Sequence, residues 1–324
     1  MPTFQRPEKP LTSAPVLLDT IPLASRSGFR RHTNRRAFLV DRALSISLGY
    51  LVLDICCCLM RQDPYFIFGP TAHPLPLHLA HLSPLTLWVY RSLTAFAGVL
   101  AALHMILSFD QVVRCLLLGP LVFGIRGELW HYPTVFGSFT NVLDRGLGGF
   151  WGGWWHQSFR VAFAAPTAFL VRKGHLVPGS MRAQLVGLIL AFLQSGFMHA
   201  AGGVTSLPRT KWWLPPLFFL SQATGIALQT RLCTAFQGDI DRVPRAGRRL
   251  GNLVFTAVWL LVTQRLLIDD LSSAALWLFE PVPVSVVRAY GFGGPGDEAI
   301  WRWDRDHFPK WYWGKHWWQT GLGI

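Results

Sequence analysis

Charged residues are scarce in this sequence, and acidic ones are the scarcest. Only 15% of the 324 residues are charged, whereas a soluble protein has about 25%. Hydrophobic residues make up 51% of the chain, and 30 Lys and Arg stand against 17 Asp and Glu. This composition excludes an ordinary soluble protein and favours one that lies in a membrane.

Cysteines are also few, and their placement excludes a disulfide framework. Three of the five are adjacent, at Cys56, Cys57 and Cys58, inside an apolar run. Neighbouring residues on a helix point in different directions, so we expect small buried thiols there. Cys115 and Cys233 are isolated. The pattern predicts no redox or metal role.

Long hydrophobic runs are abundant instead. A helix needs about 20 mainly apolar residues to cross a bilayer, and the candidate blocks are residues 43–60, 84–107, 112–125, 161–171, 183–201, 212–230, 252–268 and 271–287. The blocks 112–125 and 161–171 are short, which favours re-entrant or partly buried helices. Glu280, Pro281 and Pro283 predict a broken or kinked helix in the last block. We therefore expect an all-α fold, a multipass transmembrane helical bundle with about six crossings and short re-entrant or interfacial helices.

The distribution of basic residues sets the expected orientation. Arginines cluster before the first block and before the block 252–268, as the positive-inside rule requires of cytosolic segments. The loop 63–83 has no Lys or Arg, which places it on the opposite side. The net charge of +13 is thus expected to face anionic lipid, and no nucleic-acid partner is expected.

These patterns divide the chain into three expected parts. Residues 1–42 are a basic cytosolic tail, and their first 36 residues lack the sustained apolar core of a secretory signal. Residues 43–287 are the transmembrane domain. Residues 288–324 are a Trp-rich tail that we expect to lie at the membrane interface.

The segment 127–160 is too polar and glycine-rich to span a membrane, yet too aromatic for a free loop. Non-helical backbone at membrane depth requires a protein interior or a cavity. Asp144 is a candidate N-cap for a helix in this segment. One interpretation is an interfacial aromatic belt with a snorkelling Arg160; the alternative is a functional site. The tryptophans that suit an interface are Trp130, Trp151, Trp154 and Trp155.

A histidine stands near the end of the apolar block 183–201. His199 follows Gln194 and Ser195, and an ionisable side chain at membrane depth usually faces a protein interior and marks a function. The alternative is that His199 only ends the helix at the interface.

Two motifs in these segments resemble a known family. Residues 150–160, FWGGWWHQSFR, contain Phe-Trp-Gly and then Trp-His-Gln around His156, and residues 192–199 contain Phe-x-x-Ser-Gly-x-x-His ending in His199. Both resemble the wax synthase domain of the membrane-bound O-acyltransferase superfamily, whose core corresponds to residues 127–201. Gly153 and Trp154 replace the basic residues that the family has after Phe-Trp-Gly.

The resemblance implies transfer of an acyl group from acyl-CoA, a co-substrate, to an alcohol, with no permanently bound cofactor. It implies that His199 is the catalytic base and that His156 positions or polarises the thioester. Ser195 lies one turn before His199 and could orient its ring, although a bond to its own helix carbonyl is the alternative. The other candidates are Trp151, Trp155, Gln157 and Asp54 around the substrate tunnel, and Arg145, Arg160, Arg172 and Lys173 for the phosphates of CoA.

The sequence indicates the acyl donor and the acceptor less directly than it indicates the reaction. A small, Gly- and Trp-lined motif favours acetyl-CoA and a hydrophobic acceptor such as a terpenoid or polyketide alcohol, in the endoplasmic reticulum membrane. The alternatives are a fatty-alcohol acyltransferase that makes wax esters, a transporter or channel, and a diverted isoprenoid cyclase or isomerase. Transporters often contain internal repeats, and none is visible. We expect no metal site, since the cluster His73, His78 and His81 has no acidic or Cys partner nearby beyond Asp63.

Overall fold

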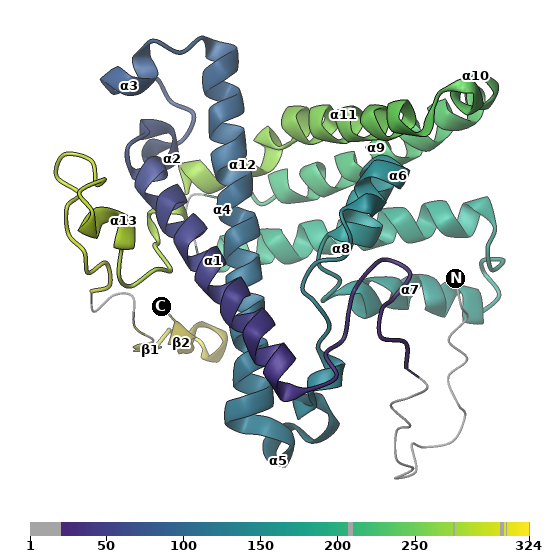
Figure 1. Ribbon diagram of the computed structural model, residues 1–324, viewed down its shortest axis with the longest axis horizontal. Coiled ribbons are helices and arrows are strands. Elements are labelled where there is room, and N and C mark those ends of the chain that lie inside the picture. The colour runs from purple at the N-terminus through teal and green to yellow at the C-terminus, as the bar shows by residue number, and fades with distance from the viewer. Residues whose placement is uncertain (1–20, 207–209, 275, 305–307, 309, 324) are drawn as a thin grey trace.

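The computed structural model describes residues 21–323 except 207–209, 275, 305–307 and 309. Helices dominate this part of the chain, and two short strands pair near its end (Figure 1). The long helices are α1 (Arg35–Arg61), α4 (Pro84–Val112), α8 (Met181–Ser206), α9 (Leu214–Ala235) and α11 (Arg245–Thr263). The shorter α-helices are α2 (Pro64–Phe68), α3 (Leu77–Ala80), α5 (Gly119–Phe123), α6 (Thr140–Gly149), α7 (Arg160–Arg172), α10 (Gln237–Arg242), α12 (Arg265–Ser273) and α13 (Val286–Ala289).

Short turns and a hairpin complete the fold. Two π-helical turns, η2 (Val113–Leu118) and η5 (Phe150–Trp154), follow α4 and α6. The 3₁₀ turns are η3 (Gly124–Gly127), η4 (Leu129–His131), η6 (Leu276–Leu278) and η8 (Trp317–Gln319). Strands β1 (Lys310–Tyr312) and β2 (Gly321–Gly323) form an antiparallel pair, with Trp311 opposite Leu322. The expected interfacial tail 288–324 contains the end of α13 and this hairpin, and part of it lies outside the described residues.

The two longest helices form a pair. Asn34 caps α1 by accepting a hydrogen bond from the N–H of Ala37 at 2.8 Å, and Ser83 caps α4, which has proline in its first turn. The helices run antiparallel (Figure 1) and approach closely at Gly49, where an added Cβ would lie 3.1 Å from the carbonyl oxygen of Ala101. The small residue thus allows the pair to form.

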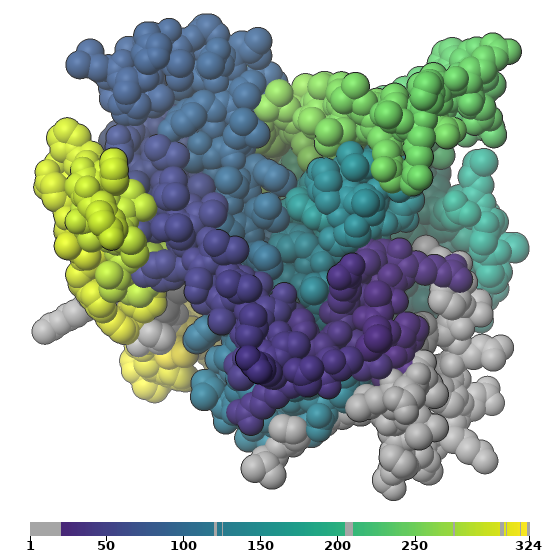
Figure 2. All heavy atoms as spheres, viewed as in Figure 1, coloured from purple at the N-terminus to yellow at the C-terminus, as the bar shows by residue number. Residues whose placement is uncertain are grey.

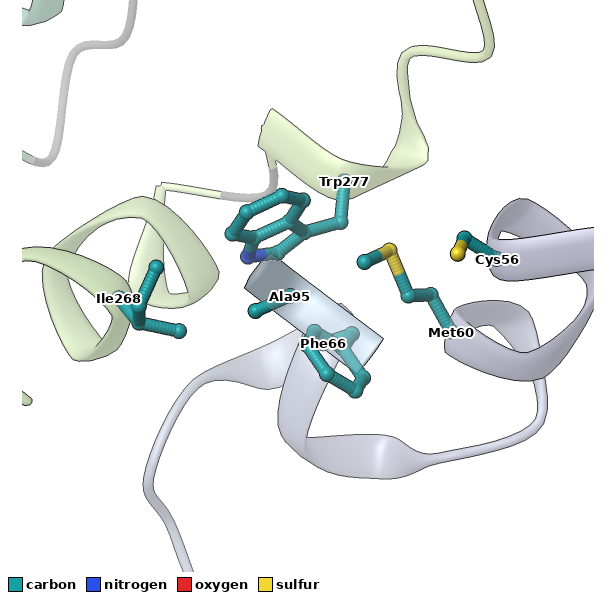
Figure 3. Close-up of a cluster of buried hydrophobic side chains, with 6 residues drawn as sticks. All are labelled: Cys56, Met60, Phe66, Ala95, Ile268 and Trp277. Atoms are coloured by element: carbon teal, nitrogen blue, oxygen red, sulfur yellow. The ribbon is translucent and has the colours of Figure 1, made fainter. Parts of the chain in front are cut away.

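A second group of helices crosses the direction of this pair. Helices α8, α9 and α11 run side by side in Figure 1, with α7 packed on α8 and α6 packed on α11. The two groups meet where α12 contacts both α9 and α2. Figure 3 shows a buried cluster at this junction, with side chains from α1, α2, α4, α12 and η6: Cys56, Met60, Phe66, Ala95, Ile268 and Trp277.

Four helical stretches in the described part of the chain are long and apolar enough to cross a membrane. They are Arg35–Arg61, Pro84–Leu118, Met181–Val204 and Arg245–Ser273. Helix α9 is comparably long but is not in this set, and it contains two buried glutamines, Gln222 and Gln229. The block 112–125 continues α4 as η2 and α5, and the block 161–171 forms α7.

The block 271–287 is broken, as Glu280, Pro281 and Pro283 predict, and it is not among the spans found in the described residues, so it does not supply a sixth crossing. Helix α12 ends at Ser273, η6 follows, and the next helix begins only at Val286. The physical reason is Glu280, which is 2% exposed and accepts hydrogen bonds from Arg288 and Arg302. A buried ion pair of this kind requires an irregular protein interior rather than a lipid-facing helix.

An ion network joins this irregular segment to α1. Arg288 is buried and donates to Glu280 at 2.9 Å and to Asp297 at 2.6 Å. Asp54 on α1 is fully buried, and its carboxylate accepts from the hydroxyl of Ser285 at 2.6 Å and from the backbone N–H of Val287 at 2.9 Å. The carboxylate of Asp54 thus fixes the start of α13 against the first long helix.

We predict that Arg288→Ala lowers the free energy of unfolding by about 3 kcal/mol, because it leaves buried carboxylates without their cation. Denaturant unfolding in detergent micelles measures this change. The matched control is Arg242→Ala, which removes an ion pair to Asp239 on the surface and should leave stability unchanged. Equal destabilisation by both variants would contradict the prediction.

Candidate functional site

The first motif begins with a helix that turns sharply at one glycine. Gly146 has φ 56° inside α6, a left-handed conformation that side chains disfavour. An added Cβ there would collide with the side-chain amide of Gln229 on α9. That amide accepts a hydrogen bond from the N–H of Leu147 at 2.9 Å and donates to Asn252 on α11 at 3.0 Å. The kink therefore ties the motif to α9 and α11.

The expected N-cap role of Asp144 is wrong. Asp144 lies within α6, which begins at Thr140 after Phe139. Its carboxylate instead binds Arg249 on α11, with Nε–Oδ1 at 2.7 Å, and this arginine lowers the pKa of Asp144. The arginines in the first turns of α11 supply the partner, and Asp144 therefore forms an ion pair between helices instead of capping one.

The N-terminal segment covers the start of the motif. The N–H of Ser138 donates to the carbonyl of Ser27, and the N–H of Thr134 donates to the carbonyl of Arg30, both at 2.9 Å. The side-chain amide of Asn141 also donates to Ser27 at 2.9 Å. Figure 2 shows this segment, in purple, lying on the surface beside the teal motif region.

A glutamine side chain ends the π-helical turn and sets the position of the first histidine. Gln157 donates from Nε2 to the carbonyls of Trp151 at 3.0 Å and Trp155 at 2.7 Å. Its own Oε1 accepts from Arg160 at 3.4 Å. Gln157 and Arg160 thus shape the backbone around His156, and the tryptophan carbonyls are satisfied without the regular helical pattern.

The rings of the motif build an aromatic wall. Trp155 stacks on Phe150, with centroids 5.4 Å apart, and on Phe96 of α4 at 6.4 Å. Trp151 meets Phe192 of α8 edge-on at 5.7 Å and Phe219 of α9 at 5.9 Å. The two predicted motifs therefore meet in the structure through their tryptophans and phenylalanines.

A close helix contact positions the second histidine. An added Cβ at Gly196 would lie 2.5 Å from Cα of Pro216, so only glycine allows α8 to approach α9 this closely. One turn later, the ring of His199 stacks on Phe219, with centroids 4.9 Å apart and planes at 20°. Phe219 is buried and fixes the plane of the imidazole. Ser195 lies one turn before His199, as the sequence predicts.

The two histidines lie close enough for their charges to interact. His156 is half-buried, and its pKa is lowered to about 4, first by desolvation and then by the nearby charge of His199. Its Nδ1 is buried without a hydrogen-bond partner among the described residues. His199 is exposed, so an imidazole of the pair is open to a substrate. His156 is neutral at pH 7 and has a ring nitrogen available for a ligand.

A buried glutamine on α9 supports this arrangement, and the sequence analysis missed it. Gln222 is 0% exposed; its Oε1 accepts from Trp151 at 3.4 Å and its Nε2 donates to Thr263 at 2.9 Å. It joins the first motif, α9 and α11. The sequence signal that could have identified Gln222 is its position as a polar residue inside the apolar block 212–230, because a buried amide in a membrane helix needs hydrogen-bond partners.

The remaining predicted residues lie in three separate places. Arg145 is exposed, donates to Asn141, and its guanidinium occupies the space beside Gly153 in the π-helical turn. Arg145 and Arg160 thus lie next to the motif. Arg172 and Lys173 lie at the opposite end of α7, about 18 Å along its axis from Arg160. Asp54 belongs to the separate ion network with α13 described above.

Comparison with known proteins identifies relatives of this chain. Residues 132–221 match the model of a family described as "Membrane bound O-acyl transferase family". The chain is 25% identical over 250 residues to Acetyltransferase spyB of Aspergillus fumigatus, covering 71% of this chain and 40% of the relative. It is 24% identical over 243 residues to Acetyltransferase atnC of Arthrinium sp, covering 71% and 53%.

A third relative is matched over a shorter stretch. Acetyltransferase nanB of Aspergillus nanangensis is 28% identical over 168 residues, covering 49% of this chain and 36% of the relative. The chain thus spans about half the length or less of these curated relatives. No solved structure matches. The resemblance stated from the two motifs is confirmed.

We predict that Gly196→Ala destabilises the protein by about 1–3 kcal/mol, because the added methyl group pushes α9 away from α8. Thermal unfolding in detergent micelles measures the change. Gly202→Ala on the same helix is the control, since an added Cβ there meets nothing within 4 Å and alanine favours a helix. A Gly196→Ala variant as stable as Gly202→Ala would contradict the close contact.

We also predict a pH dependence that belongs to His156. Because its folded pKa of about 4 lies below the unfolded value of about 6.5, the unfolded state binds more protons between these values, and stability falls as pH falls. Relative to His156→Gln, the wild-type protein should lose about 2 kcal/mol between pH 7 and pH 5. The measurement is the difference in unfolding free energy between the two proteins at each pH. If the difference in unfolding free energy between the two proteins is the same at pH 7 and pH 5, the pH dependence does not belong to His156.

Proposed function

We propose that this chain is an enzyme that transfers an acetyl group from acetyl-CoA to the hydroxyl of a hydrophobic acceptor. Its residues 132–221 belong to the membrane bound O-acyl transferase family. The observation that carries the proposal is the meeting of His156 and His199, from two motifs distant in sequence, beside one aromatic wall. The matched relatives are named acetyltransferases.

His199 acts as the general base. Its imidazole takes the proton of the acceptor hydroxyl as the oxygen attacks the thioester carbonyl carbon. The tetrahedral intermediate then collapses, the carbon–sulfur bond breaks, and the thiolate of CoA recovers the proton from the imidazolium. The products are the ester and free CoA, and no covalent acyl-enzyme forms. The exposed ring of His199 leaves room for both substrates.

His156 stabilises the developing oxyanion. A histidine with a pKa of about 4 is neutral at pH 7 and presents one ring N–H as a donor. A donor aimed at the thioester oxygen in a site that excludes water is worth about 3–4 kcal/mol in acyl transfer. The orphaned Nδ1 of His156 supports this role, because a substrate supplies the partner that the described residues lack.

Phe219 stabilises the charged state of the base. Its ring lies parallel to that of His199 at 4.9 Å, and an aromatic face attracts a cation by roughly 0.5–2 kcal/mol, depending on desolvation. The imidazolium that forms during proton transfer gains this attraction, whereas the neutral ring does not. The contact therefore favours the transition state over the ground state.

Arg145 and Arg160 are the basic residues that we assign to the phosphates of CoA. Both lie beside the first motif, and arginine binds phosphate in a bidentate manner. Arg172 and Lys173, at the far end of α7, contribute to the positive field of the same surface. We place this surface on the cytosolic side, with the N-terminal segment, in the endoplasmic reticulum membrane.

The size of the motif favours acetyl over a long acyl chain. Gly152 provides a small, open position, while five tryptophan and phenylalanine rings crowd around Trp151. A wax-ester synthase would need a channel for a long chain beside these rings. Palmitoyl transfer to hexadecanol is therefore the outcome that would indicate a wax-ester synthase instead of an acetyltransferase.

The test uses membranes that contain the full chain, labelled acetyl-CoA or palmitoyl-CoA, and a panel of farnesol, 2-naphthol and hexadecanol. We expect acetyl transfer by the wild type, a loss of about 10²–10⁴-fold in kcat for His199→Ala and of about 10²–10³-fold for His156→Ala. His175→Ala, which changes an exposed histidine in the loop after α7, is the control. Undiminished transfer by His199→Ala would overturn the mechanism.

A further inference from the structure

A cavity of ≈ 430 Å³ lies between α2, α4 and α12, apart from the histidine pair. Tyr65, Trp88 and Arg265 are among its lining residues. The segment that contains α2 has no Lys or Arg between 63 and 83, so we expect the cavity on the side of the membrane opposite the basic clusters.

Two carboxylates at or beside this cavity already accept hydrogen bonds from neighbouring side chains. Arg91 donates from Nε and Nη2 to both carboxylate oxygens of Asp63 at 2.7 Å, and Asp63 is fully buried. The hydroxyl of Tyr65 donates to Asp269 at 2.6 Å. The guanidinium of Arg91 also lies 4.7 Å over the ring of Tyr65. These contacts fix the walls of the cavity before any ligand enters.

Two donors of the cavity remain without acceptors in the described part of the chain. Arg265 lies over the ring of Trp88, 5.1 Å from its centroid, and takes part in no ion pair among the described residues. The Nε1 of Trp88 is buried and has no hydrogen-bond partner there. Leaving the buried indole N–H unsatisfied is costly, and the exposed guanidinium of Arg265 is available beside it, so the cavity is matched to a ligand that brings an accepting oxygen.

Two side chains lie between the cavity and each histidine of the proposed site. Ser92, which lines the cavity, lies one turn before Phe96, and Phe96 stacks on Trp155 beside His156. On α12, Leu266 and Leu267 pack against the cluster that contains Phe219, the ring under His199. The cavity therefore lies behind the aromatic wall that borders the proposed reaction centre.

We infer that this cavity binds the acceptor, and that the acceptor is a planar, hydrophobic molecule with a carboxylate or carbonyl oxygen besides the hydroxyl that is acylated. This inference rests on the proposed function. A carboxylate accepts two bonds from a guanidinium fork, and the indole N–H of Trp88 is a further donor beside it. A planar ring stacks on the aromatic walls.

The experiment measures binding by the purified full chain in detergent micelles, without acyl-CoA, using 6-hydroxy-2-naphthoate and 2-naphthol as probes. These molecules share a ring and a hydroxyl and differ in the carboxylate. Equilibrium dialysis should show the naphthoate bound about tenfold more tightly than the naphthol, the value of one charge-assisted hydrogen bond. Arg265→Gln should remove this preference and leave naphthol binding unchanged. Trp88→Phe, which keeps a ring but loses the N–H, should weaken naphthoate binding about threefold or more.

Two controls separate this inference from the proposed function. Arg182→Gln changes an exposed arginine at the start of α8 and should bind both probes as the wild type does. The second control is the measurement itself, which contains no acyl-CoA: an absence of acetyl transfer with a retained naphthoate preference counts against the proposed function and not against the cavity. The inference is overturned if the wild type does not bind naphthoate, if it binds both probes equally, or if Arg265→Gln retains the preference.

Discussion

The site depends on the close approach of α8 to α9 at Gly196. Without a side chain at this position, Pro216 comes near enough for Phe219, one turn further along α9, to stack on His199. The same approach brings Phe192 and Phe219 against Trp151, which links the two motifs. A backbone contact that only glycine permits thus sets the orientation of the proposed base.

Buried polar side chains hold the surrounding helices where lipid offers no hydrogen bonds. Gln222 and Gln229 on α9 bond to the first motif and to α11, and Asp54 on α1 bonds to the start of α13. Each is satisfied by protein atoms, as the apolar surroundings require. The buried polar residues of these helices therefore have different roles: the glutamines support the site, and Asp54 holds the start of α13 against α1.

Much of the fold was predictable because long apolar runs have few structural options in a membrane. The helices at 43–60, 84–107, 183–201 and 252–268 follow from hydropathy and lie within the spans found. The break in the block 271–287 was predictable from Glu280 and its neighbouring prolines. The ion pairs of Glu280 with Arg288 and Arg302 were not, because such pairing is invisible to a local average. Asp144 was misassigned for the same reason, because its partner Arg249 is distant in sequence.

The sequence by itself determined the membrane class, the two motifs and the identity of His156 and His199 as the histidines to examine. These follow from local composition and from short patterns that a single segment contains. Only the tertiary structure decided that His156 and His199 come within range of each other's charge, that Phe219 and Gln222 contact the second and first motif, and that Trp88 and Arg265 line one cavity. These contacts join α8, α9 and α4 to α12 and the first motif, and they depend on which helices pack together, which no local pattern encodes.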